Sequence, residues 1–390
     1  MSHELFSRND DLKRLRDEGY FVLQRGGHLV MREVPYVNAQ KELRVGTLIS
    51  SLNLAGDETR KPETHLVHWD GDFPCNTDGA PIQGIAHQAK AFDFGLGLKA
   101  THSFSSKPDG NYNDYHHKMT TYANIIAGPA AVLKPGATAR TFRDPEQEED
   151  SVFNYVETAS GRVEIGALTE RLTGDRVAII GLGGTGSYVL DFVAKTPVRE
   201  IRLFDADEFL THNAFRAPGA PTLEELRKAP TKVEYLKSIY SRMHRNIVAH
   251  DVALDRDHLH LLDGITFAFL SLDAGDAKRA IVEKLEAIGA AFIDVGMGLE
   301  LDGDSLGGIL RVTASTPQKR DHIAQRISFA ATTDEDIYAS NIQVADLNAL
   351  NAILAVGKWK KIRGFYRDLE REHHCTYTTD GNLLINGDHA

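Results

Sequence analysis

The pattern of hydrophobic and polar positions changes near residue 150. Before this point, short apolar runs alternate with polar turns. They predict a helix over residues 10–19 that ends at Gly19, and two strands around a Gly26-Gly27 turn over residues 20–37. A third strand that enters a loop is expected over residues 64–75, and residues 115–128 fit either a helix or a strand. We therefore expect a smaller α+β domain in this part of the chain.

After residue 150, predicted strands alternate with predicted helices. Residues 177–180 form an apolar run without polar alternation, as expected of a strand that is covered on both faces. Further strands are expected at residues 200–205, 265–273 and 290–296, with helices at residues 187–195, 223–244 and 274–289. This alternation predicts an α/β fold, a Rossmann-like and mostly parallel sheet with flanking helices.

The last part of the chain predicts a long helical stretch over residues 337–370 and a hairpin over residues 375–385 with an Asp-Gly turn. One side of the helical stretch is apolar, which suits core packing or a dimer interface; it consists of Ile342, Ala345, Leu347, Leu350, Ile353 and Leu354.

A short acidic segment with one proline, residues 143–150, has the composition of a solvated linker. We place the domain boundary there. The predicted organisation is an N-terminal α+β domain over residues 1–142, a linker over residues 143–152, and a second domain over residues 153–390 that includes the C-terminal helical and hairpin extension.

Composition narrows the class of protein. The chain has 390 residues, which favours two domains, and a net charge of −11 without a long basic block, which argues against nucleic acid as a partner. We expect no membrane span and no secretion signal, because no apolar run approaches the required length and the N-terminus is charged. The two cysteines, Cys75 and Cys375, form no CxxC pair, so we expect a cytoplasmic protein without a disulfide framework.

A glycine-rich turn joins the first predicted strand of the second domain to the next helix. It contains Gly181, Gly183, Gly184 and Gly186. Glycines at this spacing allow a tight turn, a close approach of backbone to phosphate, and close packing of helix on strand. Asp205 follows at the end of the next strand, about 24 residues after Gly181, where a ribose-binding acid belongs. The turn therefore predicts a nucleotide site.

The residues downstream favour a triphosphate over a nicotinamide dinucleotide. Asn213 and Arg216 lie on a loop after the acid, Lys232 follows, and Asp273 ends a later strand. Arginine and lysine suit phosphate oxygens, and a strand-end carboxylate suits Mg²⁺. Each residue also has an ordinary interpretation: Lys232 on a solvated helix face, Arg216 paired with Asp207, and Asp273 as a helix N-cap.

This ordered set resembles the adenylation domain of ThiF/MoeB-type and ubiquitin-activating enzymes over residues 155–315. The resemblance implies ATP and Mg²⁺ as cofactors, a ubiquitin-like protein as substrate, and adenylation of its C-terminal carboxylate. It implies an ATP-binding set of Gly181, Gly183, Gly184, Gly186, Asp205 (ribose), Asp207, Asn213, Arg216 and Lys232 (phosphates), with Asp273 on Mg²⁺; Arg216, Lys232 and Asp273 form the catalytic set. It also implies an arginine that precedes the first strand, for which Arg162 and Arg171 are candidates.

The chain departs from this family in its cysteines. It lacks the two CxxC pairs that bind zinc in many relatives, and residues 296–321 carry no cysteine for a thioester. Cys375 beside His373 and His374 is a weak candidate, since a cysteine in a predicted strand is usually packed; a hydroxyl acceptor such as Ser305, Thr313, Ser315 or Thr316 is an alternative. Cys75 with His65, His68 and His87 suggests a metal site only weakly, because residues three apart on a strand face opposite ways.

The leading hypothesis is therefore an adenylyltransferase that activates a ubiquitin-like protein for a conjugating-enzyme-like partner. The resemblance places such two-part proteins in bacterial ubiquitination-like pathways, some linked to phage defence, and implies a homodimer. A conjugating-enzyme-like fold for residues 1–142 is an open alternative. The competing functions are a sulfur-carrier adenylyltransferase, an NAD-dependent oxidoreductase, and a non-catalytic partner-binding subunit.

Overall fold

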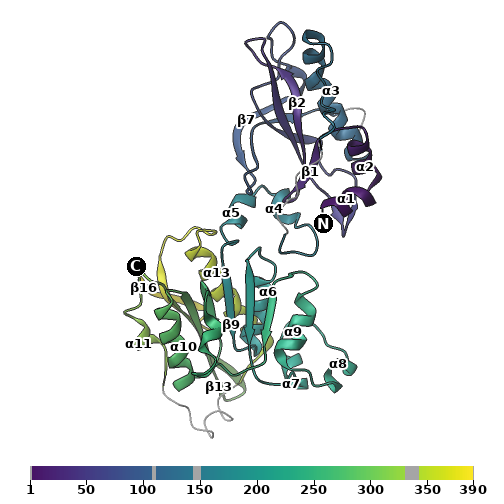
Figure 1. Ribbon diagram of the computed structural model, residues 1–390. Coiled ribbons are helices and arrows are strands. Elements are labelled where there is room, and N and C mark those ends of the chain that lie inside the picture. Colours follow the sequence, from purple (N-terminus) through teal and green to yellow (C-terminus); the bar gives the residue numbers. More distant parts are fainter. Residues whose placement is uncertain (1, 108–110, 144–150, 330–341, 390) are drawn as a thin grey trace. The chain divides into compact units, whose positions relative to one another are not determined.

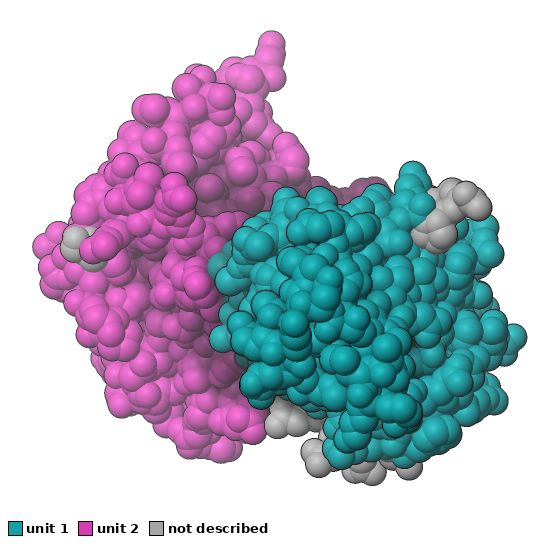
Figure 2. Space-filling view, turned by 90° about the horizontal axis from the view of Figure 1, so that it is seen from above, with its two compact units in different colours: residues 1–170 teal, residues 171–390 magenta. Residues whose placement is uncertain are grey.

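The structure is a computed structural model that describes residues 2–107, 111–143, 151–329 and 342–389. It divides into two compact units, residues 1–170 and 171–390, which are coloured separately in Figure 2. Most of the predicted linker, residues 144–150, lies outside the described residues. No helix in the described ranges has both the length and the apolar character needed to span a bilayer.

Unit 1 is built on an antiparallel sheet, of which β1, β2 and β7 are labelled in Figure 1. Its six strands follow the order β1-β2-β3-β6-β8-β7. The strands are β1 (Val22–Arg25), β2 (His28–Val37), β3 (Leu43–Ser51), β6 (Leu66–Asp70), β7 (Ala86–Asp93) and β8 (Lys99–Ser105); β4 (Leu54–Ala55) and β5 (Glu58–Thr59) form a separate small hairpin. The predicted glycine turn joins β1 to β2, where Arg25 pairs with His28. The helices are α1 (Ser2–Arg8), α2 (Asp10–Asp17), α3 (Tyr115–Leu133), α4 (Ala159–Arg162) and α5 (Gly166–Glu170).

The segment that fitted either a helix or a strand forms the helix α3, which begins after the capping side chain of Asp114. The helices α1 to α3 pack their apolar side chains against one face of the sheet, around Trp69 and Phe104. Within this core Lys118 is fully buried, and its Nζ donates to Ser50 Oγ and Thr64 O, both at 2.9 Å. The described residues give it no carboxylate partner, and burial lowers the pKa of Lys118 to about 7.

Unit 2 confirms the predicted α/β fold with a mostly parallel sheet. Its eight strands follow the order β11-β10-β9-β12-β13-β14-β15-β16, and the first five of these run parallel. The parallel strands are β9 (Arg176–Ile180), β10 (Glu200–Phe204), β11 (Ile247–His250), β12 (Phe267–Leu270) and β13 (Ala291–Asp302). The strands β14 (Ser305–Ser315), β15 (Glu372–Thr378) and β16 (Leu383–His389) extend the sheet antiparallel, and β15 and β16 form the predicted hairpin.

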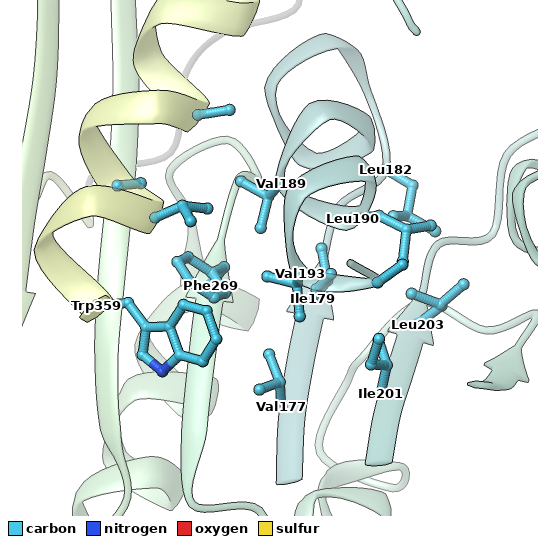
Figure 3. Packing of buried hydrophobic residues seen from close by; sticks show 14 of the residues in the cluster. Val177, Ile179, Leu182, Val189, Leu190, Val193, Ile201, Leu203, Phe269 and Trp359 are labelled. Atoms are coloured by element: carbon cyan, nitrogen blue, oxygen red, sulfur yellow. The ribbon is translucent and has the colours of Figure 1, made fainter. Parts of the chain in front are cut away.

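Helices cover both faces of this sheet. The strands carry apolar side chains on both faces, so both faces must be shielded from water. The helices α6 (Gly184–Val193) and α13 (Ala345–Ile362) share one core with Val177, Ile179, Leu203 and Phe269 (Figure 3). The helix α9 (Lys232–Tyr240) contributes Val233 and Leu236 to the same core. The helix α10 (Asp276–Ala287) shares a second core with Ala178, Ile180 and Leu270 on the other face. The shorter helices are α7 (Thr211–Ala214), α8 (Leu223–Arg227) and α11 (Ile323–Arg326).

The face that α13 turns to the core differs from the predicted apolar face. Ile353 is 51% exposed, whereas the buried side includes Asn348, Asn351, Ala352 and Ala355. Small residues are needed there because α13 packs closely against α6, where a Cβ on Gly184 would lie 2.1 Å from Asn348 Nδ2. The sequence left both core packing and a dimer interface open for the apolar face, and of that face Leu354 packs partly against the core of unit 2. Apolar side-chain size alone does not report how closely two helices approach.

The buried Lys118 predicts that unit 1 becomes more stable as the pH rises above 7. Unfolding returns the ammonium group to water and to its usual pKa of 10.5, so between pH 7 and 10 the unfolded chain binds more protons than the folded chain. The free energy of unfolding should rise on the order of 1 to 2 kcal/mol between pH 7 and 9. Urea unfolding of the full chain with the Trp359→Phe change, followed by the fluorescence of Trp69, measures this.

The control is Lys118→Met in the same Trp359→Phe background. It removes the titrating group while it keeps a long apolar side chain, so the pH dependence attributed to Lys118 should disappear. An equal rise with pH in both proteins would contradict the assignment.

Candidate functional site

The glycine turn lies where the direction of the strand order reverses. From β9 the sheet continues through β10 to β11 on one side and through β12 to β13 on the other. In open α/β sheets, ligands bind at such a switch point, beyond the carboxyl ends of the strands. The turn between β9 and α6 and the segment after β12 meet there, where Ser271 Oγ donates to Gly181 O at 2.6 Å.

Three of the four loop glycines are required by packing within the chain. Gly181 has a φ of +85°, and a Cβ there would lie 2.3 Å from Ser271 O. A Cβ on Gly186 would lie 1.9 Å from Gly181 O, and one on Gly184 would meet Asn348. Gly183 differs, because its φ is −70° and a Cβ there would meet no atom of the described residues within 4 Å. Gly183 therefore faces open space at the N-terminus of α6, where backbone amides can receive an anion.

Asp205, Asp207 and Lys232 form one charged cluster. Lys232 Nζ lies 2.6 Å from Asp207 Oδ2 and 3.3 Å from Asp205 Oδ1. Asp205 also accepts from the Leu182 amide in the glycine turn at 2.6 Å, so the acid at the end of β10 is tied to the loop. Lys232 is 6% exposed, which excludes the alternative of a solvated helix face. The side chain of Asp207 is 74% exposed, so this carboxylate is open to solvent.

Asn213 and Arg216 have buried polar atoms without partners in the described part of the chain. Asn213 Oδ1 accepts from the Leu210 amide at 2.9 Å, but Asn213 Nδ2 has no partner. Arg216 Nε is likewise buried and unpartnered. Burial lowers the pKa of Arg216, against the opposing effect of the Asp207 charge. The ordinary interpretation of Arg216 paired it with Asp207. In the structure Asp207 instead forms its ion pair with Lys232. These two buried hydrogen-bond donors, Asn213 Nδ2 and Arg216 Nε, therefore lack an acceptor in the described part of the chain.

Asp273 lies beyond the end of β12 and lines a pocket of about 210 Å³ together with Gly183 and Gly184. It is exposed, and the residue that caps α10 is Gly275. The interpretation of Asp273 as an N-cap is therefore wrong. The structure brings Asp273 together with the glycine turn, and it brings Lys232 together with Asp205 and Asp207. Asp205 connects the two groups, because it accepts from the Leu182 amide of the glycine turn.

The two candidate arginines before β9 make other contacts. Arg162 belongs to unit 1, where it pairs with Glu63 at 2.7 Å. Arg171 donates to Gly364 O, just beyond α13. Each of these guanidinium groups thus has a partner within its own unit.

Sequence reasoning missed four residues that line the pocket, namely Lys278, Arg311, Asn348 and Asn351. They come from α10, β14 and α13, far apart in the chain, and no local motif links them. Asn348 accepts from Thr185 Oγ1 at 3.0 Å, and Asn351 Nδ2 donates to Gly296 O at 3.1 Å. Asn348 Nδ2 and Asn351 Oδ1 have no partner in the described ranges. The signal available in the sequence was the presence of the polar Asn348 and Asn351 within the otherwise apolar part of α13.

These donors fit a nucleoside triphosphate. Phosphate oxygens accept hydrogen bonds and carry negative charge, which matches the unpartnered Asn213 and Arg216, the cation of Lys232 and the open Gly183. Within the described residues no three His, Cys, Asp or Glu side chains gather as a metal site. A Mg²⁺ held by Asp273 would therefore take its other ligands from phosphates and water, which is the usual way this ion is bound.

Both cysteines are packed inside their units. Cys375 lies on β15 opposite Val312, is 9% exposed, and burial raises its pKa to about 11. Cys75 is 1% exposed, and burial raises its pKa as well. His374 beside Cys375 bonds with Thr313, and burial lowers the pKa of this imidazole to about 4, so it carries no charge that would favour a thiolate. Neither thiol is arranged as a nucleophile.

Gly183→Ala should leave the fold intact and weaken ATP binding, because a methyl group there would point into the open space that phosphate needs. We expect a loss of about tenfold or more in ATP affinity, measured by equilibrium dialysis, with an unchanged melting temperature. Gly186→Ala is the matched comparison: its methyl group would collide with Gly181 O, so this variant should lose stability. Unchanged ATP binding in a folded Gly183→Ala protein would contradict the phosphate role of the loop.

The native protein should resist alkylation of its cysteines. Iodoacetamide at pH 8 reacts with the thiolate form, which burial disfavours at both Cys75 and Cys375. Intact mass measurement should find no adduct over a period in which the urea-unfolded chain gains two. Rapid labelling of Cys375 in the folded protein would reopen its catalytic interpretation.

Comparison with known families identifies both parts of the chain. Residues 161–362, more than half of the chain, match the model of the ThiF family, and residues 10–158 match a domain of unknown function, DUF6791. A search of curated proteins gave no match.

Among solved structures, similar ones include Escherichia coli MccB with MccA-N7isoASN, at 16% identity and a TM-score of 0.47 over 58% of this chain and 68% of that one. MccB with ATP matches at 18% identity and a TM-score of 0.43, over 57% of this chain and 65% of that one. PaaA matches at 17% identity and a TM-score of 0.44, over 59% of this chain and 77% of the PaaA chain. The chain thus spans about two thirds of the length of MccB. On the strength of the family match, this chain is a member of the ThiF family that carries an additional N-terminal DUF6791 domain.

Proposed function

We propose that this protein is an ATP-dependent adenylyltransferase that activates the C-terminal carboxylate of a ubiquitin-like protein, for transfer to a conjugating-enzyme-like partner in a bacterial ubiquitination-like pathway. Membership of the ThiF family supports the class of reaction. The single observation that carries the proposal is the pair Asn213 Nδ2 and Arg216 Nε, two buried atoms without a hydrogen-bond partner among the described residues. Buried donors without acceptors destabilise a fold, so their retention indicates an acceptor-rich ligand such as a polyphosphate.

The charges of the site suit this reaction. A carboxylate that approaches a phosphate meets strong electrostatic repulsion, and ATP supplies the adenylyl group and the pyrophosphate leaving group. Lys232 and Arg216 provide positive charge that offsets this repulsion and stabilises the charge that develops on the phosphate oxygens. No general base is required, because the attacking carboxylate is already ionised at neutral pH.

The same residues argue against hydride transfer. A nicotinamide dinucleotide needs one acid at the ribose and a glycine turn at its diphosphate. Such a cofactor does not require the positive charges of Lys232 and Arg216. It also does not require the amide of Asn213 or the carboxylate of Asp273. The packed cysteines favour direct passage of the acyl group from the adenylate to a nucleophile on the partner protein, without a thioester on this chain.

Lys232→Ala should lower the rate of ATP–pyrophosphate exchange at least about a hundredfold, because it removes a preorganised cation from the charged transition state. The assay uses the full chain and candidate ubiquitin-like proteins encoded beside it. Lys237→Ala, an exposed lysine on the same helix α9, is the matched control and should exchange at the native rate.

Exchange that survives Lys232→Ala would show the phosphate assignment to be wrong. Absence of exchange with every partner, together with tight binding of NAD, would replace the proposed activity with an oxidoreductase. Exchange only with a small sulfur-carrier protein would keep the reaction and change the substrate.

A further inference from the structure

Arg311 on β14 is held in a fixed orientation at the wall of the pocket beside the glycine turn. Its Nη2 donates to Asp294 Oδ2 at 2.6 Å, and its Nη1 donates to Thr313 Oγ1 at 2.9 Å. Asp294 on β13 is fully buried, and its other oxygen lies 2.5 Å from Nζ of Lys278, which is also buried. An arginine bound in this way is oriented before any ligand arrives.

The backbone opposite Arg311 leaves space for the guanidinium group. Gly296 on β13 pairs with Arg311 across the two strands, and a Cβ on Gly296 would lie 2.8 Å from Arg311 Nη2. The guanidinium group therefore lies over Gly296, where a larger residue would displace it. The Arg311 side chain remains 23% exposed, so part of the group is open to the pocket.

The pocket and the charged cluster proposed for the phosphates adjoin the same glycine turn but consist of different side chains. The lining of the pocket includes Gly183, Gly184 and Asp273 but none of Asp205, Asn213, Arg216 or Lys232. Its volume of about 210 Å³ is below the range of pockets that hold a drug-sized ligand. It suits a narrow segment of chain and not a whole nucleotide. The unpartnered Asn348 Nδ2 and Asn351 Oδ1 on its wall, a donor and an acceptor, fit a polar chain with peptide groups.

The largely buried group of Lys278, Arg311 and Asp294 carries a net positive charge, and Asp273, the other carboxylate that lines the pocket, is the residue proposed to hold Mg²⁺. Lys278 and Arg311 share the single carboxylate of Asp294, and Lys278 is 4% exposed. Of the two cations, Arg311 is thus the one that a ligand in the pocket can reach. The chain as a whole carries a net charge of −11 and repels a negatively charged substrate, so a local cation is needed to hold a carboxylate there.

We propose that Arg311 binds the C-terminal carboxylate of the acyl substrate beside the glycine turn, and that Asp294 orients Arg311 for this task. This inference rests on the proposed adenylation, because it assigns the group that receives the carboxylate in that reaction. A guanidinium group forms paired hydrogen bonds with a carboxylate, which fixes the direction as well as the position of the substrate. Arg311 thereby places the carboxylate next to Gly183 and Gly184, whose turn faces the phosphates.

The test is direct binding by the full chain, without turnover, in the presence of a non-hydrolysable ATP analogue. The probes are N-acetylglycylglycine and its C-terminal carboxamide, which differ only in the negative charge and the acceptor oxygens that Arg311 would contact. The native protein should prefer the carboxylate by about tenfold or more, as expected of a charge-assisted hydrogen bond. Isothermal titration calorimetry or ligand-observed NMR measures both affinities.

Arg311→Gln should abolish this preference and lower the affinity for the carboxylate about ten- to a hundredfold, while the affinity for ATP stays at the native value. Arg311→Lys keeps the charge but not the paired geometry and should fall between the two. Arg326→Gln is the matched control: it removes the same charge from an arginine that pairs with Asp388 and does not line the pocket, so the preference should remain. Asp294 keeps Lys278 as a partner in Arg311→Gln, and circular dichroism verifies the fold.

Two outcomes would overturn the inference while the proposed function stands. If Arg311→Gln retains the preference for the carboxylate, another group receives the substrate. If Arg311→Gln weakens ATP binding and leaves peptide binding unchanged, Arg311 contacts phosphate. Failure of the proposed function is distinguishable, because native protein would then show no ATP–pyrophosphate exchange with any carboxylate substrate.

Discussion

The close approach of two chain segments at the carboxyl ends of β9 and β12 is the constraint on which the site depends. Ser271 bonds to Gly181 O, and neither Gly181 nor Gly186 has room for a Cβ. This contact fixes the start of α6 and turns its N-terminus toward the edge of the sheet where the strand order reverses. Because the loop is set by backbone contacts, Gly183 is left free of packing and available to a ligand.

Two cationic groups flank this loop, and each is held by at least one carboxylate whose side chain is largely buried, Asp205 in the first and Asp294 in the second. On the β10 side, Lys232 lies between Asp205 and Asp207. On the β13 side, Lys278 and Arg311 share Asp294. Each arrangement keeps cations oriented in a chain whose overall charge is negative, and the unpartnered donors of Asn213 and Arg216 add to the first group. Preorganised charge of this kind is what phosphoryl chemistry requires of a protein.

The parts of the site that follow one another in sequence could be predicted, and the parts joined only by sheet register could not. The glycine turn and the strand-end Asp205 are local features of one βαβ unit, and the loop after it carries Asn213 and Arg216. Arg311 is different: it reaches Asp294 because β14 pairs antiparallel with β13 in a register that aligns Arg311 with Gly296. That register is set by long-range packing, so neither residue carries a recognisable signal in the sequence.

The helix α13 shows why hydrophobic periodicity alone does not identify the side of a helix that packs on the core. Periodicity selects the largest apolar side chains, and these favoured the side that includes Ile353. The close contact with α6 instead requires small or flat side chains, so Ala352 and Ala355 face the core together with Asn348 and Asn351. Two amides are thereby carried to the wall of the pocket, where Asn348 bonds to Thr185 and Asn351 to Gly296. The need for close packing and the polar lining of the pocket thus have one structural cause.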